Sequence, residues 1–303
     1  MHILITGATG FIGTALSKKL LQDGHSLVAL STRPQERNRL PDTSVQAISW
    51  QLPVADLAKV LETCDAVINL AGADISARSW SASYKKIMED SRILTTQKLV
   101  EAIRLAGNKP KVFIQGSAIG FYGNHPAQTF DEESPRGRGY LPDLVERWEN
   151  AANPLTEMGI RVVWIRTGVV IGRNGGMLKA LEPAFRLFAG GPPGNGKQWF
   201  SWIALRDEVN AVLFLLDQTD LSGMFNLTAP EPMQIKDFLK VFGKVMNRPS
   251  WLPLPRPALR LFLGERADAL LLASQKVIPK RLTDNGFQFE FPEANKALGS
   301  MYS

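Results

Sequence analysis

The sequence has one cysteine, Cys64, and three histidines among its 303 residues. A single thiol cannot form an internal disulfide framework, so we expect a reducing, cytoplasmic environment. His2, His25 and His125 lack the spacing of a metal-binding motif, and we expect no metal site. No apolar run is long enough to span a bilayer, and a strand is expected at the very start of the chain. We therefore expect no signal peptide and no contact with a membrane.

The positive charge of the sequence is spread out rather than clustered. Lys and Arg number 35 against 29 Asp and Glu, which gives a net charge of +6. The basic residues form no run interleaved with aromatic side chains, as a nucleic-acid-binding face requires. We therefore expect no nucleic-acid partner and some attraction for phosphorylated small molecules. Hydrophobic residues make up 45% of the chain, and no internal repeat is visible. This length and composition predict one large domain or a domain with an added lobe.

A glycine-rich stretch near the N-terminus organises the rest of the chain. Apolar residues 2–5 predict a buried strand before it, and the apolar face of residues 14–22 predicts a helix after it. Gly7, Gly10 and Gly13 therefore stand between a strand and a helix. The first glycine permits a tight turn, the second lets backbone approach a pyrophosphate, and the third lets the helix pack close to the sheet. The pattern predicts a dinucleotide site at the N-terminus of this helix.

The end of the second predicted strand indicates which dinucleotide binds. An acidic side chain here would accept hydrogen bonds from the ribose hydroxyls of NAD. This chain instead has Ser31, Thr32 and Arg33, with Arg37 and Arg39 further on. Hydroxyls and a guanidinium bind a 2′-phosphate, which an acid would repel. The sequence therefore favours NADP over NAD.

Predicted strands alternate with predicted helices through the first part of the chain. We expect further strands at residues 26–30, 45–50, 65–72, 111–115 and 160–165, and helices at 55–62, 84–105 and 143–157. This alternation implies right-handed parallel crossovers and a Rossmann-type doubly wound α/β sheet. Ligands bind outside the carboxyl ends of such strands, so Asn69, Ala71 and Gly72 should flank the cofactor.

The alternation weakens beyond residue 172. We expect helices at residues 177–189, 208–216 and 235–246, and strands at 198–203, 225–228 and 287–291. Residues 1–172 should form the nucleotide-binding domain, and residues 173–303 a smaller α+β substrate lobe. Part of residues 205–228 should return to the first domain.

These motifs, in this order, resemble the extended short-chain dehydrogenase/reductase superfamily from residue 1 to about residue 216. They are the glycine-rich stretch, Asn69 to Gly72, Ser117 after the fifth strand, and Arg166 to Gly172. The whole chain is similar to one branch, the nucleoside-diphosphate-sugar-epimerase-like proteins with a distinctive C-terminal domain. That likeness rests on residues 190–202, 252–255 and 275–279. The resemblance implies NADP binding and names no substrate.

The resemblance also implies a catalytic set. In the superfamily a tyrosine moves the proton on the substrate oxygen, a lysine four positions later lowers the pKa of that tyrosine, and a Ser or Thr orients the substrate. Ser117 and Tyr140 stand in the expected places. Position 144, however, is Leu144 rather than lysine. A phenol without a nearby cation is a poor base at neutral pH.

The missing cation leaves two questions open. Arg136, Arg138 or Arg147 would have to fold back to supply the charge. Tyr122 is a second catalytic candidate, because it lies five residues after Ser117 on the same loop. Tyr122 can also be read as a structural aromatic at the end of the strand.

The expected binding residues follow from the strand ends, the glycine turn and the resemblance together. The cofactor residues are Gly7, Thr9, Gly10, Phe11, Ile12, Gly13, Ser31, Thr32, Arg33, Leu70, Ala71, Gly72, Ser117 and Val169. In the second lobe, Trp199 and Arg206 are the expected substrate-binding residues, although Trp199 can equally fill a core.

These observations predict an NADP-dependent oxidoreductase or epimerase of atypical short-chain type. Its substrate would be a small carbonyl or carbinol compound, nucleotide-linked or free, and the protein would be a monomer or homodimer. The absent lysine supports an alternative, a non-catalytic NADP(H)-binding sensor or scaffold. A third reading, a site for another nucleotide such as a methyl-donor cofactor, leaves Arg33 without a role.

Overall fold

The computed structural model describes residues 1–35, 40, 42–173 and 175–302, and its centre is a parallel seven-stranded sheet. The strand order is β11-β7-β5-β4-β1-β2-β3. These strands are β1 (His2–Thr6), β2 (Ser26–Ser31), β3 (Gln46–Ser49), β4 (Ala66–Asn69), β5 (Val112–Ala118), β7 (Arg161–Thr167) and β11 (Gly223–Leu227). The first strand, β1, lies inside the sheet. β2 and β3 extend the sheet on one side of it, and β4, β5, β7 and β11 extend it on the other, so the strand order reverses between β1 and β4. The predicted doubly wound Rossmann-type sheet is therefore confirmed.

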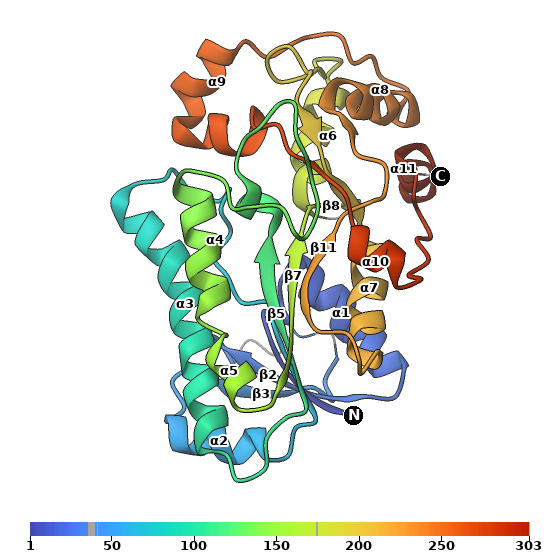
Figure 1. The fold of residues 1–303 in the computed structure, drawn as a ribbon. Helices are drawn as coiled ribbons and strands as arrows, with labels where there is room; N and C mark the ends of the chain where they lie inside the picture. The colour runs from blue at the N-terminus through green and yellow to red at the C-terminus, as the bar shows by residue number, and fades with distance from the viewer. Residues whose placement is uncertain (36–39, 41, 174, 303) are drawn as a thin grey trace.

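Helices cover both faces of this sheet (Figure 1). Ile3 and Ile5 of β1 belong to one core, together with α1 (Phe11–Gln22) and α7 (Leu205–Asp217). Leu4 belongs to the opposite core, with α2 (Val54–Leu61) and α3 (Ala82–Leu105). Burial on both faces explains why these strands read as continuous apolar runs.

The helix expected at residues 143–157 begins earlier and ends earlier. α4 (Tyr140–Asn150) follows Gly139, whose φ of +113° favours glycine. Pro154 has no N–H to donate to the carbonyl of Asn150, so α4 ends there and the short helix α5 (Pro154–Glu157) follows. Tyr140 therefore lies in the first turn of a helix, not in the preceding loop where the sequence predicted it.

A second core lies beyond the carboxyl ends of the strands. α6 (Gly176–Arg186), α8 (Ile235–Met246) and α11 (Ala294–Tyr302) pack there around Phe185, Phe238 and Phe242 (Figure 1). Two short pairings support them: β8 (Val169–Gly172) with β10 (Trp202–Ala204), and β9 (Trp199–Phe200) with β12 (Met233–Gln234). Residues 173–303 contribute mainly to this second core. Two of their elements belong to the first part instead: β11 is a strand of the central sheet, and α7 packs against that sheet.

The C-terminal segment returns to the first part of the chain. After α9 (Arg256–Leu263) and a π-helical turn (Ala267–Leu271), β13 (Lys276–Val277) pairs in parallel with β6 (Thr129–Phe130). A short 3-10 helix (Ile119–Tyr122) lies beside this pairing, and α10 (Lys280–Asp284) follows it. The C-terminal segment therefore covers the loops that follow β5.

Residues 287–291 are described in full, and they do not form the strand that their alternating aromatic residues predict. The carboxylate of Asp207 accepts hydrogen bonds from the N–H groups of Glu290, at 2.8 Å, and Phe291, at 2.9 Å. Phe287 and Phe289 pack edge to face, with ring centroids 4.8 Å apart. Asp207 thus takes backbone donors that a neighbouring strand would need. The alternation reflects the packing of these rings and not strand pairing.

Candidate functional site

The three glycines after β1 occupy positions that a side chain would disturb. Gly7 has a φ of +71°, and the N–H of Gly10 donates to its carbonyl oxygen over 2.9 Å. A Cβ on Gly13 would overlap that same oxygen, so α1 packs close only because Gly13 has none. Among the described atoms, a Cβ on Gly10 would meet only this oxygen, at 3.2 Å, and would otherwise face open space. The N-terminus of α1 is therefore accessible to a ligand.

A cleft of about 670 Å³ opens at the carboxyl ends of β1, β2 and β4. Its lining includes the predicted cofactor residues Gly7, Thr9, Ser31, Thr32, Arg33, Ala71 and Gly72. α3 forms the opposite wall with Ile87, Asp90, Ser91, Leu94 and Thr95. Residues that are far apart in the sequence therefore meet in one cavity.

The turn after β2 forms one end of this cleft. The Oγ of Ser31 accepts a hydrogen bond from the backbone N–H of Arg33 at 3.0 Å. This bond shapes the turn and leaves Thr32 and Arg33 exposed beside the cavity. Arg37 and Arg39 lie outside the described residues.

Beneath the glycine turn lies a chain of buried polar side chains. The Oγ1 of Thr6 donates to Asn69 Oδ1 at 2.6 Å, and Asn69 Nδ2 donates to Thr96 Oγ1 and Gln115 Oε1 at 2.9 and 3.0 Å. Thr6 Oγ1 also accepts from the N–H of Ala71 at 2.9 Å. Asn69 therefore ties β1, β5 and α3 together below the cleft, and Ala71 rather than Asn69 lines it.

The other expected cofactor residues lie outside the lining of this cleft. The ring of Phe11 packs against the glycine turn after β8, where a Cβ on Gly175 would overlap it. Ile12 follows Phe11 in the first turn of α1. The carbonyl group of Leu70 faces the glycine turn, and Val169 pairs with β10. None of these four residues lines the cleft.

Ser117 belongs to a buried hydrogen-bonded cluster. Its Oγ donates to Glu149 Oε1 at 2.5 Å, and Arg166 donates to both oxygens of the same carboxylate at 2.8 and 2.9 Å. Arg166 Nη1 also donates to the hydroxyl of Tyr122 at 3.1 Å, and that hydroxyl donates to Asn226 Oδ1 at 2.7 Å. Burial raises the pKa of Tyr122 to about 12, against the opposing effect of Arg166. This geometry favours the structural reading of Tyr122.

Tyr140 has a different setting, at the boundary between the two parts of the chain. Its hydroxyl donates to the carbonyl oxygen of Lys85 at 3.2 Å, and its ring packs against Trp80, with centroids 5.5 Å apart. It lines a cavity of about 220 Å³ together with residues of the C-terminal segment, including Glu265 and Gln275. Burial raises the pKa of Tyr140 to about 12; Glu89 raises it too.

Three arginines were candidates for the positive charge beside Tyr140, and two of them form ion pairs with carboxylates. Arg136 pairs with Asp143 and with Glu146, and Arg147 pairs with Glu89 at 3.1 Å. Arg138 lines the same small cavity as Tyr140.

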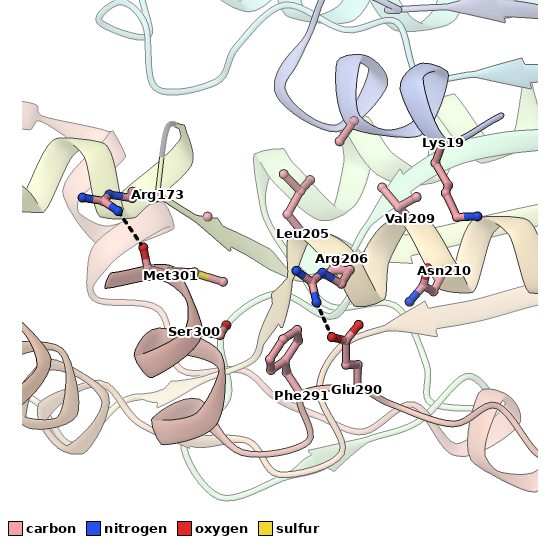
Figure 2. Close-up of a pocket in the computed structure, with 12 residues that line it drawn as sticks. Lys19, Arg173, Leu205, Arg206, Val209, Asn210, Glu290, Phe291, Ser300 and Met301 are labelled. Atoms are coloured by element: carbon pink, nitrogen blue, oxygen red, sulfur yellow. Dashed lines mark hydrogen bonds and ion pairs between the residues drawn. The ribbon is translucent and has the colours of Figure 1, made fainter. Parts of the chain in front are cut away.

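Trp199 and Arg206 lie in separate surroundings. Lys276 Nζ stands 4.5 Å from the ring centroid of Trp199 in β9. Arg206, at the start of α7, lines another cavity, of about 590 Å³, between α1, α7 and α11 (Figure 2). There it forms an ion pair with Glu290, and Arg173 donates to the carbonyl of Met301 at 3.3 Å (Figure 2). Their assignment to one substrate site stays a prediction.

Within the described ranges, no group of three or more His, Cys, Asp and Glu side chains could hold a metal ion. None of the helices that the structure describes is both long enough and apolar enough to cross a bilayer.

The buried pair of Glu149 and Arg166 is the main feature of the site that sequence reasoning missed. Glu149 lies on the buried face of α4 with Leu144, Val145 and Trp148. A glutamate within an apolar stripe must have a partner, because an unpaired buried carboxylate is costly. That stripe was the available signal, but the sequence alone does not identify Arg166 as the partner.

Known proteins resemble this chain over nearly its whole length. The family model described as the NAD dependent epimerase/dehydratase family matches residues 3–228, and a domain of unknown function, DUF1731, matches residues 254–301. An epimerase family protein of Arabidopsis thaliana, an SDR39U1 homolog named as chloroplastic, is 38% identical over 98% of this chain and 86% of its own length. The epimerase family protein YfhF of Bacillus subtilis is 35% identical over 99% and 98%. Because the plant relative is named for the chloroplast, the cytoplasmic location of this chain stays a prediction.

Solved structures show the same likeness. The crystal structure of the human epimerase family protein SDR39U1 with NADPH is 35% identical, with a TM-score of 0.91 over 100% of this chain and 99% of that one. The UDP-glucuronic acid 4-epimerase of Bacillus cereus, at 20% identity and a TM-score of 0.79 over 100% and 98%, shares the fold. The chain belongs to the NAD dependent epimerase/dehydratase family.

Proposed function

We propose that this protein is an NADP(H)-dependent oxidoreductase or epimerase that acts on a small carbonyl or carbinol compound. The observation that carries the proposal is the single cleft that joins the glycine turn, the Ser31–Arg33 turn and the Ala71–Gly72 turn. The human relative crystallised with NADPH supports the choice of cofactor.

The residues present fit a dinucleotide. The open space beside Gly10 leaves room for a pyrophosphate against the N-terminus of α1, where unpaired N–H groups and the positive end of the helix dipole attract it. Arg33 and the hydroxyls beside it would hold a 2′-phosphate. When bound, the nicotinamide supplies hydride exchange with a carbon of the substrate. Tyr140 would give a proton to the substrate oxygen during reduction and take it back during oxidation.

A Gly10→Val variant should lose nucleotide binding. The added side chain would occupy the space beside the glycine turn, where the pyrophosphate must approach the backbone. Folding should survive, because Gly10 has a φ of −77°, which other residues adopt freely. Calorimetric titration with NADPH measures the first effect and thermal unfolding the second. A variant that binds with native affinity contradicts this assignment.

Gly13→Val is the matched control for this loop. Its Cβ would overlap the carbonyl oxygen of Gly7, so this change should destabilise the fold itself by forcing α1 away from the sheet. Equal stability losses in the two variants would contradict the separate roles given to the two glycines.

An Arg33→Ala variant should lose most of the preference for NADP over NAD. We expect the native protein to bind NADP(H) at least about tenfold more tightly, because one charge-assisted pair to phosphate contributes about 1.5–3 kcal/mol. The measurement is calorimetric affinity for both cofactors in both proteins. Equal affinities for the two cofactors in the native protein would contradict the proposed phosphate contact.

A second candidate function is a non-catalytic NADP(H)-binding sensor. Two observations favour it: Leu144 stands in the place of the superfamily lysine, and the Tyr140 hydroxyl is bound to a backbone carbonyl. The nucleotide that co-purifies with the protein separates the two functions. An enzyme should change the oxidation state of that nucleotide during incubation with cell metabolites, whereas a sensor should not.

A further inference from the structure

α3 packs along α4, the helix that carries Tyr140. The Tyr140 hydroxyl donates to the carbonyl oxygen of Lys85, and the Arg92 guanidinium donates to that of Met88, three residues further along α3. Lys85 Nζ lies 4.5 Å from the ring centroid of Tyr140, and Arg92 Cζ lies 5.1 Å from the ring of Trp148. Lys85 and Arg92 are seven residues apart, two helical turns, and Tyr140 and Trp148 are eight apart. Leu144 lies midway between Tyr140 and Trp148 and packs into the same apolar cluster as Met88 of α3. The two cations therefore lie on either side of the position where the superfamily has its lysine.

Arg92 connects this helix pair to the cofactor cleft. Its Nη1 donates to the carbonyl oxygens of Ala73 and Met88, both at 3.1 Å. A Cβ on Gly72 would stand 2.9 Å from the Arg92 Cζ, so the guanidinium lies directly behind the turn that lines the cleft. In the described part of the chain, no carboxylate lies within ion-pair distance of Arg92. Its charge therefore acts on its surroundings without a paired anion.

Lys85 is less able than Arg92 to place an unbalanced positive charge beside Tyr140. Its ammonium forms an ion pair with Glu265 at 2.5 Å, and 26% of its side chain is exposed. The paired carboxylate offsets its charge, and solvent screens the rest.

The charged groups around Tyr140 come from three elements. Burial raises the pKa of its hydroxyl, as do Glu89 of α3 and Glu265 of the C-terminal segment, while Arg92 of α3 and Arg147 of α4 lower it. Arg147 is 55% exposed and paired with Glu89, so Arg92 is the more effective of the two.

We propose that Arg92 takes the place of the absent lysine, as a positioning residue that holds a positive charge beside Tyr140 and fixes the Gly72–Ala73 turn against the bound cofactor. This inference rests on the proposed function, because it assigns the proton transfer to Tyr140. In this arrangement the cation comes from α3, whereas the superfamily lysine comes from the helix of the tyrosine.

The experiment replaces Tyr140 by a fluorinated tyrosine whose phenol ionises near neutral pH. Fluorine NMR then follows its titration in the full chain saturated with NADPH. We expect Arg92→Met and Arg92→Gln to raise the titration midpoint by about one pH unit, the low end for removing a nearby opposite charge. Arg92→Lys should restore most of the native midpoint. A purely structural role for Arg92 would not produce this pattern of charge loss and rescue.

Two controls make the result decisive. Arg147→Gln and Lys85→Gln should move the midpoint much less, and a larger effect of Lys85→Gln than of Arg92→Met would overturn the assignment. Arg92→Met keeps the aliphatic stem, so it can be read even where Arg92→Gln fails to fold. An unchanged midpoint in every folded Arg92 variant would also overturn it.

The titration is independent of turnover, which separates this inference from the proposed function. A native protein that binds NADPH but reduces no compound would contradict the enzyme, while the midpoint would still report on Arg92. If the native protein is active, Arg92→Met should also lower kcat with NADPH about tenfold or more, and Arg92→Lys should recover part of it.

Discussion

Tyr140→Phe should lower turnover with NADPH at least about a hundredfold, the low end for the loss of a general acid. The substitution removes the hydroxyl and keeps the ring that packs against Trp80. NADPH affinity should stay unchanged, because Tyr140 is absent from the lining of the cofactor cleft that the structure describes. The measurement is a panel of carbonyl compounds and sugar nucleotides assayed with the native protein and the variant.

The pH dependence of the same reaction follows from the pKa of Tyr140, which burial raises to about 12. Carbonyl reduction requires the protonated phenol, which predominates throughout the neutral range, so this group should leave the reduction rate flat there. Oxidation of an alcohol requires the phenolate. Its rate should rise about tenfold for each pH unit below the pKa. An oxidation rate that does not change with pH would exclude Tyr140 as the base.

Tyr122→Phe is the matched control for this tyrosine. It removes a hydroxyl that is held between Arg166 and Asn226, so it should lower stability more than it lowers turnover. Full activity in both tyrosine variants would exclude both as the acid. Tight NADPH binding with no activity on the whole panel would favour the sensor.

Glu149→Gln should destabilise the fold by roughly 3–5 kcal/mol, the usual cost of leaving a buried charge without its partner. The side chains of Glu149 and Arg166 are only 5% and 4% exposed. Glutamine keeps the size of the side chain but removes the charge that balances Arg166. The free energy of unfolding in urea, with an unchanged slope, measures the loss.

Glu146→Gln provides the comparison on the same helix. Glu146 is 44% exposed and pairs with Arg136 at 3.2 Å, so its loss should change stability by no more than about 1 kcal/mol. Similar losses in the two variants would contradict the importance given to burial. Because Ser117 also donates to Glu149, Ser117→Ala should leave an acceptor short of a partner and cause a smaller loss than Glu149→Gln.

Local sequence patterns predicted most of the fold. The apolar runs of β1, β4 and β5 predict buried parallel strands, because strands covered on both faces consist of nearly continuous apolar side chains. The glycine turn was predictable for a similar reason. Gly7 is required by its positive φ, and Gly13 by the close approach of α1 to the carbonyl oxygen of Gly7. Both constraints act between residues that are near each other in the sequence. The place of Ser31, Thr32 and Arg33 in the lining of the cleft was also predictable, because it depends only on where one strand ends.

Local patterns failed where long-range contacts compete with them. Residues 287–291 alternate like a strand, but Asp207, some eighty residues earlier, binds their backbone N–H groups. Ser117 was expected at the cofactor, yet Glu149 and Arg166 bury it in a cluster that draws on three separate elements.

The sequence by itself therefore determined the sheet, the glycine turn and the absence of a lysine at position 144, since each is a property of one residue or of neighbours along the chain. Only the tertiary structure decided which cations stand beside the helix that carries Tyr140: Lys85 lies 4.5 Å from the ring centroid of Tyr140, and Arg92 lies 5.1 Å from that of Trp148. Arg92 precedes Tyr140 by 48 positions and reaches the helix that carries it because α3 and α4 pack against each other. Electrostatic effects depend on distance and burial in space, which separation along a sequence does not report.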